Sequence, residues 1–160
     1  LVRRVPIVAR SGNRGEVSAG CDWCRVSSPD NVTDTRELNT ARLFVPAFTA
    51  PQERAVLQIH GRDELSGDAA FIVSDPDGAL SLDTLRSLEL TLRYRNDVVA
   101  RAAGGSGLLQ LAWHPDRVRK LLIVRNDASF DSLELAMHPG ALESLDVYAA
   151  CAEDAGNHAR

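Results

Sequence analysis

Apolar and polar residues alternate along much of the chain, and this period of two predicts β-strands. The clearest run is Leu88-Glu-Leu-Thr-Leu-Arg-Tyr-Arg95, in which the leucines and Tyr94 share one face and polar residues share the other. Such a run is typical of a strand with one buried face and one face in water. Less regular runs of the same kind predict strands at 41–48, 54–60, 69–74, 107–113, 118–125 and 132–138, and shorter ones at 5–9 and 146–151.

Turn-forming residues separate these runs. The strongest groups are Ser11-Gly-Asn-Arg-Gly15, Asp75-Pro-Asp-Gly78 and Ala103-Gly-Gly-Ser-Gly107. The tripeptide Arg-Asn-Asp stands at 95–97 and again at 125–127, each time at the end of a predicted strand. Because Asn and Asp tolerate left-handed backbone conformations, both tripeptides suit tight hairpins.

Helix is expected only in short pieces. Ser81 suits the N-cap of a helix at 81–86, Pro139 suits the start of one at 139–145, and 115–119 offers a single turn. The sequence therefore predicts a mostly β fold, an antiparallel sandwich or small barrel with one or two short helices. All 160 residues are expected to form a single β-rich domain with loose ends at about 1–4 and 153–160.

Composition limits the partners. The net charge of -4 and a pI near 5.5 disfavour nucleic acid, because phosphate binding needs a basic surface. Four arginines make the N-terminal segment basic, which we interpret as a solvated end, with an anionic partner as the alternative; they are Arg3, Arg4, Arg10 and Arg14. Lys120 is the only lysine, which we interpret as codon bias in a GC-rich bacterial genome. The sequence contains no run of 18 apolar residues that could span a membrane, and no signal peptide is visible. The missing signal peptide does not indicate the cytoplasm, because the chain begins at Leu1 rather than Met and an export signal is removable.

The three cysteines are Cys21, Cys24 and Cys151, and a structural disulfide is the favoured interpretation. A bridge from Cys21 or Cys24 to Cys151 would close a loop across most of the domain and stabilise it by roughly 4–5 kcal/mol. A bridge between Cys21 and Cys24 would close a tiny loop and stabilise much less. Buried thiols are the alternative, and any disulfide would indicate an oxidising compartment.

Metal binding and redox catalysis are less favoured uses of the cysteines. A zinc ribbon needs two closely spaced cysteine pairs, and only one is present. A redox pair places its first cysteine at the start of a helix, whereas Pro29 and two serines follow Cys24. We therefore expect no metal and no cofactor.

No local motif predicts catalysis. Gly104-Gly-Ser-Gly107 lacks the residues of a nucleophile elbow or a phosphate loop, and Asp75-Pro-Asp-Gly78 lacks the later ligands of a calcium loop. Ser106, His114 and Asp116 are the types found in a triad, but His114-Pro-Asp116 is more simply a turn after Trp113. If the protein is an enzyme, its site is expected inside a small barrel, and the first candidates to line that pocket are His60, His114, Arg93 and Tyr94.

The C-terminal stretch Phe130-Asp-Ser-Leu133, followed by Ala141-Leu142, Leu145 and Cys151, resembles the tail of small bacterial periplasmic β proteins. These are of the invasion-associated-locus and type VI secretion-associated kind, and the likeness covers about 20 residues. The resemblance implies an exported, non-catalytic envelope protein, and it identifies no site residues.

A non-enzymatic binding or protein-interaction module of the bacterial cell envelope is the leading functional hypothesis. Its partner is expected to be another protein, bound at a strand edge or a loop tip, and two copies pairing through a strand edge are an open alternative. The location is expected to be periplasmic or secreted, with the cytoplasm as the alternative. The competing functions are a small β-barrel enzyme with an internal pocket and a structural subunit of a secretion or phage-like assembly.

Overall fold

A computed structural model describes residues 4–6, 14–19, 21, 23–34, 36, 38–76, 78, 80–81, 83–104, 106, 108–140 and 142–153. The strands of this part are β1 (Arg4–Pro6), β2 (Arg14–Ala19), β3 (Arg25–Ser27), β4 (Ala41–Phe44), β5 (Ala55–Leu65), β6 (Ala69–Ser74), β7 (Leu88–Tyr94), β8 (Asp97–Ala103), β9 (Leu109–Trp113), β10 (Lys120–Val124), β11 (Phe130–Met137) and β12 (Ser144–Glu153). Two short 3-10 helices accompany them, η2 (Pro29–Val32) and η3 (Thr84–Ser87).

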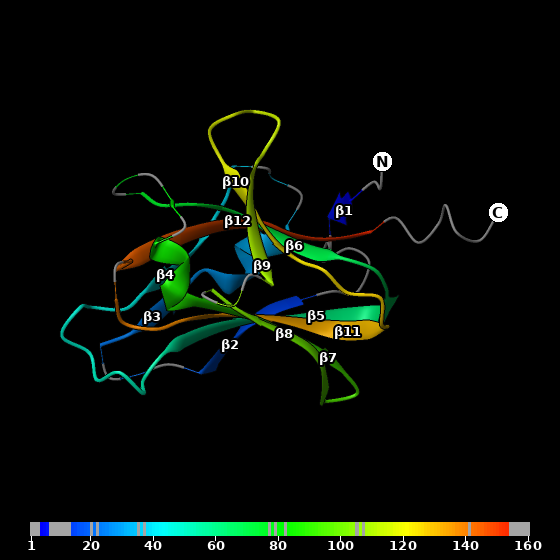
Figure 1. Ribbon diagram of the computed structural model, residues 1–160, viewed down its shortest axis with the longest axis horizontal. Helices are drawn as coiled ribbons and strands as arrows, with labels where there is room; N and C mark the ends of the chain where they lie inside the picture. Colours follow the sequence, from blue (N-terminus) through cyan, green and yellow to red (C-terminus); the bar gives the residue numbers. More distant parts are fainter. Residues whose placement is uncertain are drawn as a thin grey trace.

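The strands form two antiparallel sheets that pack face to face (Figure 1). The seven-stranded sheet has the order β3-β4-β12-β6-β10-β9, with β1 also paired to β12, and the five-stranded sheet has the order β2-β5-β11-β7-β8. One hydrophobic cluster fills the space between them, and its largest members include Phe71, Phe130, Leu43, Leu57, Leu122 and Leu135. The predicted mostly β sandwich is confirmed.

Strand β7 shows how the alternation becomes structure. Leu88, Leu90 and Leu92 are 0–1% exposed and belong to the core, as their shared face predicts. Arg95 and Asn96 then adopt positive φ angles of 49° and 73°, the backbone that a tight hairpin requires. The hairpin predicted at 95–97 is therefore present, and it joins β7 to β8.

The second Arg-Asn-Asp tripeptide, at 125–127, does not form a hairpin. It follows β10 of the seven-stranded sheet and leads to β11 of the five-stranded one. Asn126 fixes this crossing: its backbone N–H donates to Asp68 Oδ1 at 2.8 Å, and its side-chain amide donates to the carbonyl of Gly67 at 3.0 Å. The same tripeptide thus forms a hairpin at 95–97 and a crossing between the sheets at 125–127. The difference comes from the hydrogen bonds that Asn126 makes with Gly67 and Asp68.

Several expected elements differ from the observed ones. The helix expected at 139–145 is wrong, because Ser144 already begins β12, whose first residues pair with β4. The helix expected at 81–86 is the single 3-10 turn η3. Of the ends expected to be loose, Arg4 and Glu153 pair with each other, and 1–3 and 154–160 lie outside the described residues.

The glycine-rich stretch 103–107 connects the two sheets rather than closing a hairpin. It leads from β8, at one edge of the five-stranded sheet, to β9, at one edge of the seven-stranded sheet. A Cβ atom at Gly104 would overlap the backbone carbonyl of Leu85, so the close approach of the two backbones requires glycine there. The described residues contain no helix long and apolar enough to cross a membrane.

Candidate functional site

The core-facing row of β9 ends in an exposed tryptophan. Leu109, Leu111 and Trp113 lie on one face of β9, and the first two pair with Val124 and Leu122 of the core. Leu109 is 4% exposed, whereas Trp113 is 60% exposed. The apolar face of β9 therefore extends beyond the core at its C-terminal end, where the indole ring of Trp113 is exposed to solvent.

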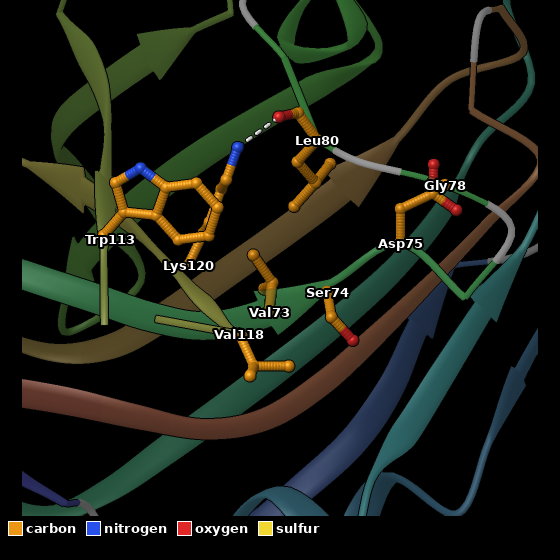
Figure 2. A pocket seen from close by; sticks show the side chains of 8 residues that line it. All are labelled: Val73, Ser74, Asp75, Gly78, Leu80, Trp113, Val118 and Lys120. Atoms are coloured by element: carbon orange, nitrogen blue, oxygen red, sulfur yellow. Dashed lines mark hydrogen bonds between the residues drawn. The ribbon is translucent and has the colours of Figure 1, made fainter. Parts of the chain in front are cut away.

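Trp113 forms one wall of a groove of about 310 Å³ (Figure 2). The groove is lined by Val73, Ser74, Asp75, Gly78, Leu80, Trp113, Val118 and Lys120. These residues come from the β9–β10 hairpin, from the end of β6 and from the loop that follows β6. The lining combines an aromatic ring, aliphatic side chains, a hydroxyl, a carboxylate and an ammonium group.

Lys120 holds the indole in place. Its Nζ lies 4.4 Å from the centroid of the Trp113 ring and donates a hydrogen bond to the carbonyl of Leu80. Figure 2 shows the ammonium group between the ring and this carbonyl. A cation over an aromatic face is attractive, more so where water is partly excluded. Lys120 therefore links the tryptophan wall to the loop on the other side of the groove.

The tip of the hairpin is fixed by Asp116. Its Oδ1 accepts the backbone N–H groups of Val118 at 2.9 Å and Arg119 at 3.0 Å, and its Oδ2 accepts Arg119 Nε at 2.6 Å. The backbone N–H of Arg119, then that of Val118, holds the pKa of the Asp116 carboxyl well below its usual range. The turn predicted at 114–116 is present, since the N–H of Arg117 donates to the carbonyl of His114 at 2.9 Å.

The hairpin is also tied to the outer face of its sheet. The guanidinium of Arg119 lies 4.9 Å from the centroid of the Tyr148 ring, and the Tyr148 hydroxyl lies 3.2 Å from Ser74 Oγ. Arg119 thus ties the hairpin to Tyr148 of β12, and Ser74 of β6 lies at the Tyr148 hydroxyl. The exposed Trp113 thus belongs to a rigid element, which favours binding because little side-chain freedom is lost.

A second depression, of about 570 Å³, adjoins the first. It is lined by Trp113, His114, Pro115 and Arg117, so Trp113 borders both hollows. His114 is the one sequence-based pocket candidate that lies here. The Ser-His-Asp triad is not assembled, because Ser106 precedes β9 and His114 follows it, so the two residues lie beyond opposite ends of an extended strand.

The other three pocket candidates lie on the five-stranded sheet. His60 and Arg93 occupy one row, each paired with Ser132 of the strand between them. Arg93 Nε makes an ion pair with Glu134 Oε1 at 2.8 Å, and the Tyr94 ring lies under Arg95. None of the three lines the groove, so the structure does not bring the four candidates into one pocket.

The disulfide joins Cys21 to Cys24, and the expected long bridge to Cys151 is wrong. A turn, with the Cys24 N–H bonded to the carbonyl of Cys21 at 3.2 Å, sets their Cα atoms 4.7 Å apart, which suits a disulfide. Cys24 belongs to the core between the sheets. Ala150 and Ala152 also belong to it, so Cys151 between them points to the opposite face of β12, where it is buried.

The disulfide supports a second exposed aromatic surface, which we call the aromatic pair. Trp23, between the two cysteines, is 64% exposed, and Phe48 is 75% exposed. Their ring centroids are 6.4 Å apart in an edge-to-face arrangement. The loop of Phe48 is held by the N–H of Ala47, which donates to Glu143 Oε1 at 3.2 Å.

The sequence analysis predicted neither the exposed Trp113 nor the aromatic pair. The expectation that no metal is bound stays a prediction. Within the described ranges, no three His, Cys, Asp or Glu side chains are grouped so that they could hold a metal ion.

The sequence matches no known protein family and no curated protein. Solved structures share its fold. The family 32 carbohydrate-binding module (CBM) from C. perfringens NanJ, in complex with galactose, has a TM-score of 0.57 and 8% identity, over 95% of this chain and 100% of that one. A mutant of the lectin binding domain of Lectinolysin, complexed with Lewis b, has a TM-score of 0.58 and 12% identity, over 96% and 98%. Allantoicase from Saccharomyces cerevisiae has a TM-score of 0.56 and 11% sequence identity, and the match covers 94% of this chain and 43% of that one. At such low identities the likeness shows the fold alone.

Proposed function

We propose that the protein is a non-catalytic binding module for carbohydrate and that the Trp113 groove holds a sugar residue of a glycan. The observation that carries the proposal is the exposed indole of Trp113, fixed by Lys120 as one wall of a groove with polar groups on its other walls. Two of the structures that share this fold, the NanJ module and the Lectinolysin domain, hold sugars.

The chemistry of the groove suits a sugar. A pyranose ring presents C–H bonds on one face, which pack on an aromatic ring, and hydroxyl groups at its rim, which need donors and acceptors. Trp113 supplies the ring, one face of which the Lys120 ammonium covers. Lys120 supplies the N–H donors that its bond to Leu80 leaves over, and Asp75 supplies a carboxylate. A volume of about 310 Å³ is at the small end of ligand pockets, which suits one terminal sugar better than a long chain.

A glycan partner replaces the protein partner expected from the sequence. The Cys21–Cys24 disulfide supports an oxidising location, periplasmic or secreted. The envelope location implied by the resemblance of the C-terminal stretch is kept as part of this proposal. A module of this kind would attach to glycans at or outside the cell surface.

Calorimetric titration with glycans ending in galactose, N-acetylgalactosamine or fucose tests the proposal. We expect millimolar or tighter binding of at least one of them by the unaltered protein. The variant Trp113→Ala should lose that binding, and Trp23→Ala should keep it. Absence of binding to every glycan at millimolar concentration, with the protein folded, would overturn the proposal.

A further inference from the structure

The open edges of the two sheets differ in how they are protected. Strands at an edge expose unpaired N–H and C=O groups, and proteins guard them with charges, proline, bulges or short length. Edge strand β2 has a register shift, and edge strand β8 carries Asp97 and Arg101 and has another. Edge strand β3 has three residues, one of them Arg25, and β1 also has only three.

Edge strand β9 has none of these protections. Its sequence, Leu109-Gln-Leu-Ala-Trp113, contains neither a charged residue nor a proline, and its pairing with β10 is regular throughout. Within the described part of the chain, it is the one edge strand of either sheet with this property. Its free side is therefore open to another strand.

The hydrogen-bonding pattern of β9 fixes which backbone groups face outward. The N–H of His114 donates to the carbonyl of Arg119, so His114 bonds toward β10. Along an antiparallel strand, the backbone N–H and C=O groups of successive residues point alternately to the two sides. Those of Gln110 and Ala112 therefore also bond toward β10. The N–H and C=O groups of Leu109, Leu111 and Trp113 then point away from the sheet.

Apolar side chains lie at both ends of this open edge. Leu108, just before β9, is 61% exposed, and Trp113, the last residue of β9, is 60% exposed. Val118, in the turn that follows β9, is 77% exposed. These three are among the eight large apolar side chains that are exposed among the described residues. Exposed apolar residues along one edge mark an interaction surface.

We propose that β9 pairs with β9 of a second copy of this chain, antiparallel, about a two-fold axis at Leu111. In this register Leu109 of each copy lies opposite Trp113 of the other, and Leu111 lies opposite itself. Every N–H and C=O group of β9 that points away from β10 is then paired in both copies. The core-facing sides of the two sheets lie on the same side of the joined sheet. The contact strand is uncharged, so the net charge of -4 on each copy is not concentrated at the interface.

The second copy is the occupant that this geometry favours. The outward groups lie symmetrically about Leu111, so two identical strands satisfy each other completely, which is the self-complementarity that a two-fold interface needs. The inference does not rest on carbohydrate binding. A dimer would nevertheless carry two Trp113 grooves in one continuous sheet, and bivalent attachment raises avidity.

Engineered cross-linking tests the register. In the proposed pairing, Gln110 lies opposite Ala112 of the other copy as a non-hydrogen-bonded pair, whose Cα atoms are about 4.5 Å apart. The double variant Gln110→Cys/Ala112→Cys should form a covalent dimer under mild oxidation. The single variant Gln110→Cys is the control, because its two introduced thiols, one on each copy, would be diagonal neighbours at about 7–8 Å, too far for a disulfide. Equal cross-linking of both variants, or of neither, would overturn the proposed pairing.

Sedimentation equilibrium of the unaltered protein provides an independent test. We expect a concentration-dependent dimer that Gln110→Lys weakens about twofold to threefold at low salt, because it places a charge about 7–8 Å from its symmetry mate on an exposed face without changing the core. Leu111→Pro should also weaken it, since the lost N–H points away from β10 and the β9–β10 ladder stays intact. A protein that remains monomeric at several hundred micromolar would contradict the inference.

Discussion

Trp113 and Trp23 are the two tryptophans of the chain, and they are almost equally exposed, at 60% and 64%. Trp113 stands on a strand, is held by the ammonium of Lys120 and forms a wall of a groove. Trp23 stands on a loop between two bonded cysteines and meets the edge of Phe48. Exposure is therefore not what separates them. The difference is that polar groups converge around Trp113, while another aromatic ring is the contact described at Trp23.

The largest expected effect on binding is the loss of glycan affinity in Trp113→Ala. Removing the indole takes away the surface on which the sugar ring packs, so affinity should fall at least about tenfold, or 1.4 kcal/mol. Isothermal titration calorimetry measures this, with Trp23→Ala as the matched control. If Trp23→Ala lost the binding and Trp113→Ala kept it, the assignment of the two tryptophans would have to be exchanged.

Removing the disulfide should change stability without changing binding. Closing so short a loop stabilises by about 2 kcal/mol in the chain-entropy model, so Cys21→Ala/Cys24→Ala should lower the Tm by about 4–8 °C. Thermal unfolding followed by circular dichroism gives the shift. The glycan affinity should stay within about twofold, because the groove lies on other elements; a larger loss would mean that the aromatic pair takes part in binding.

Lys120→Met should weaken glycan binding about fivefold. The methionine keeps much of the stem, but it lacks the cation above Trp113 and the hydrogen bond to Leu80, contacts that together contribute on the order of 1 kcal/mol. The control is Arg117→Met, which removes a cation from the same hairpin but outside the groove. Titration calorimetry should separate the two variants, and equal losses would show only a general effect of charge.

The smallest expected effect is the pH dependence that Asp116 gives to stability. Its pKa in the folded protein is depressed below the ordinary value of 3.8, so the carboxylate stabilises the fold above that pH, and this contribution is lost as the pH falls further. Asp116→Asn should therefore lower the Tm slightly at pH 7 and less and less below pH 3.8. Calorimetric scans from neutral to acidic pH measure the difference in Tm between the unaltered protein and Asp116→Asn. A difference that grew as the pH fell would contradict the prediction.

The sequence predicted the parts of the fold that follow from local alternation. Residues 88–94 alternate cleanly, and the core face they predict is the one observed. Strands β2 and β8 were not predicted, because Gly15 and the arginines suggested a turn in the first and Val-Val-Ala-Arg-Ala-Ala in the second breaks the alternation at a register shift. Pro139 suggested a helix start, but pairing with β4 extends the chain from Ser144 onward.

The groove could be predicted only in small part. His114 was singled out, and it lies beside Trp113, but Lys120 was interpreted only as a sign of codon usage. Trp113 and Lys120 face each other because β9 and β10 pair in a particular register, and Asp75 and Leu80 join them from a loop far earlier in the chain. Hydrophobic periodicity reports local structure and does not predict contacts between residues so far apart in the sequence. The one available signal was Trp113 itself, a tryptophan at the end of an apolar row.

One measurement tests the central claim most directly: the two indole N–H signals in a ¹H–¹⁵N NMR spectrum, followed during titration with the glycan that binds best. The chain has two tryptophans, and Trp23→Phe assigns the pair. The account predicts that the Trp113 signal shifts and saturates with the ligand while the Trp23 signal stays in place. A shift of the Trp23 signal alone, with the Trp113 signal unmoved, would contradict it.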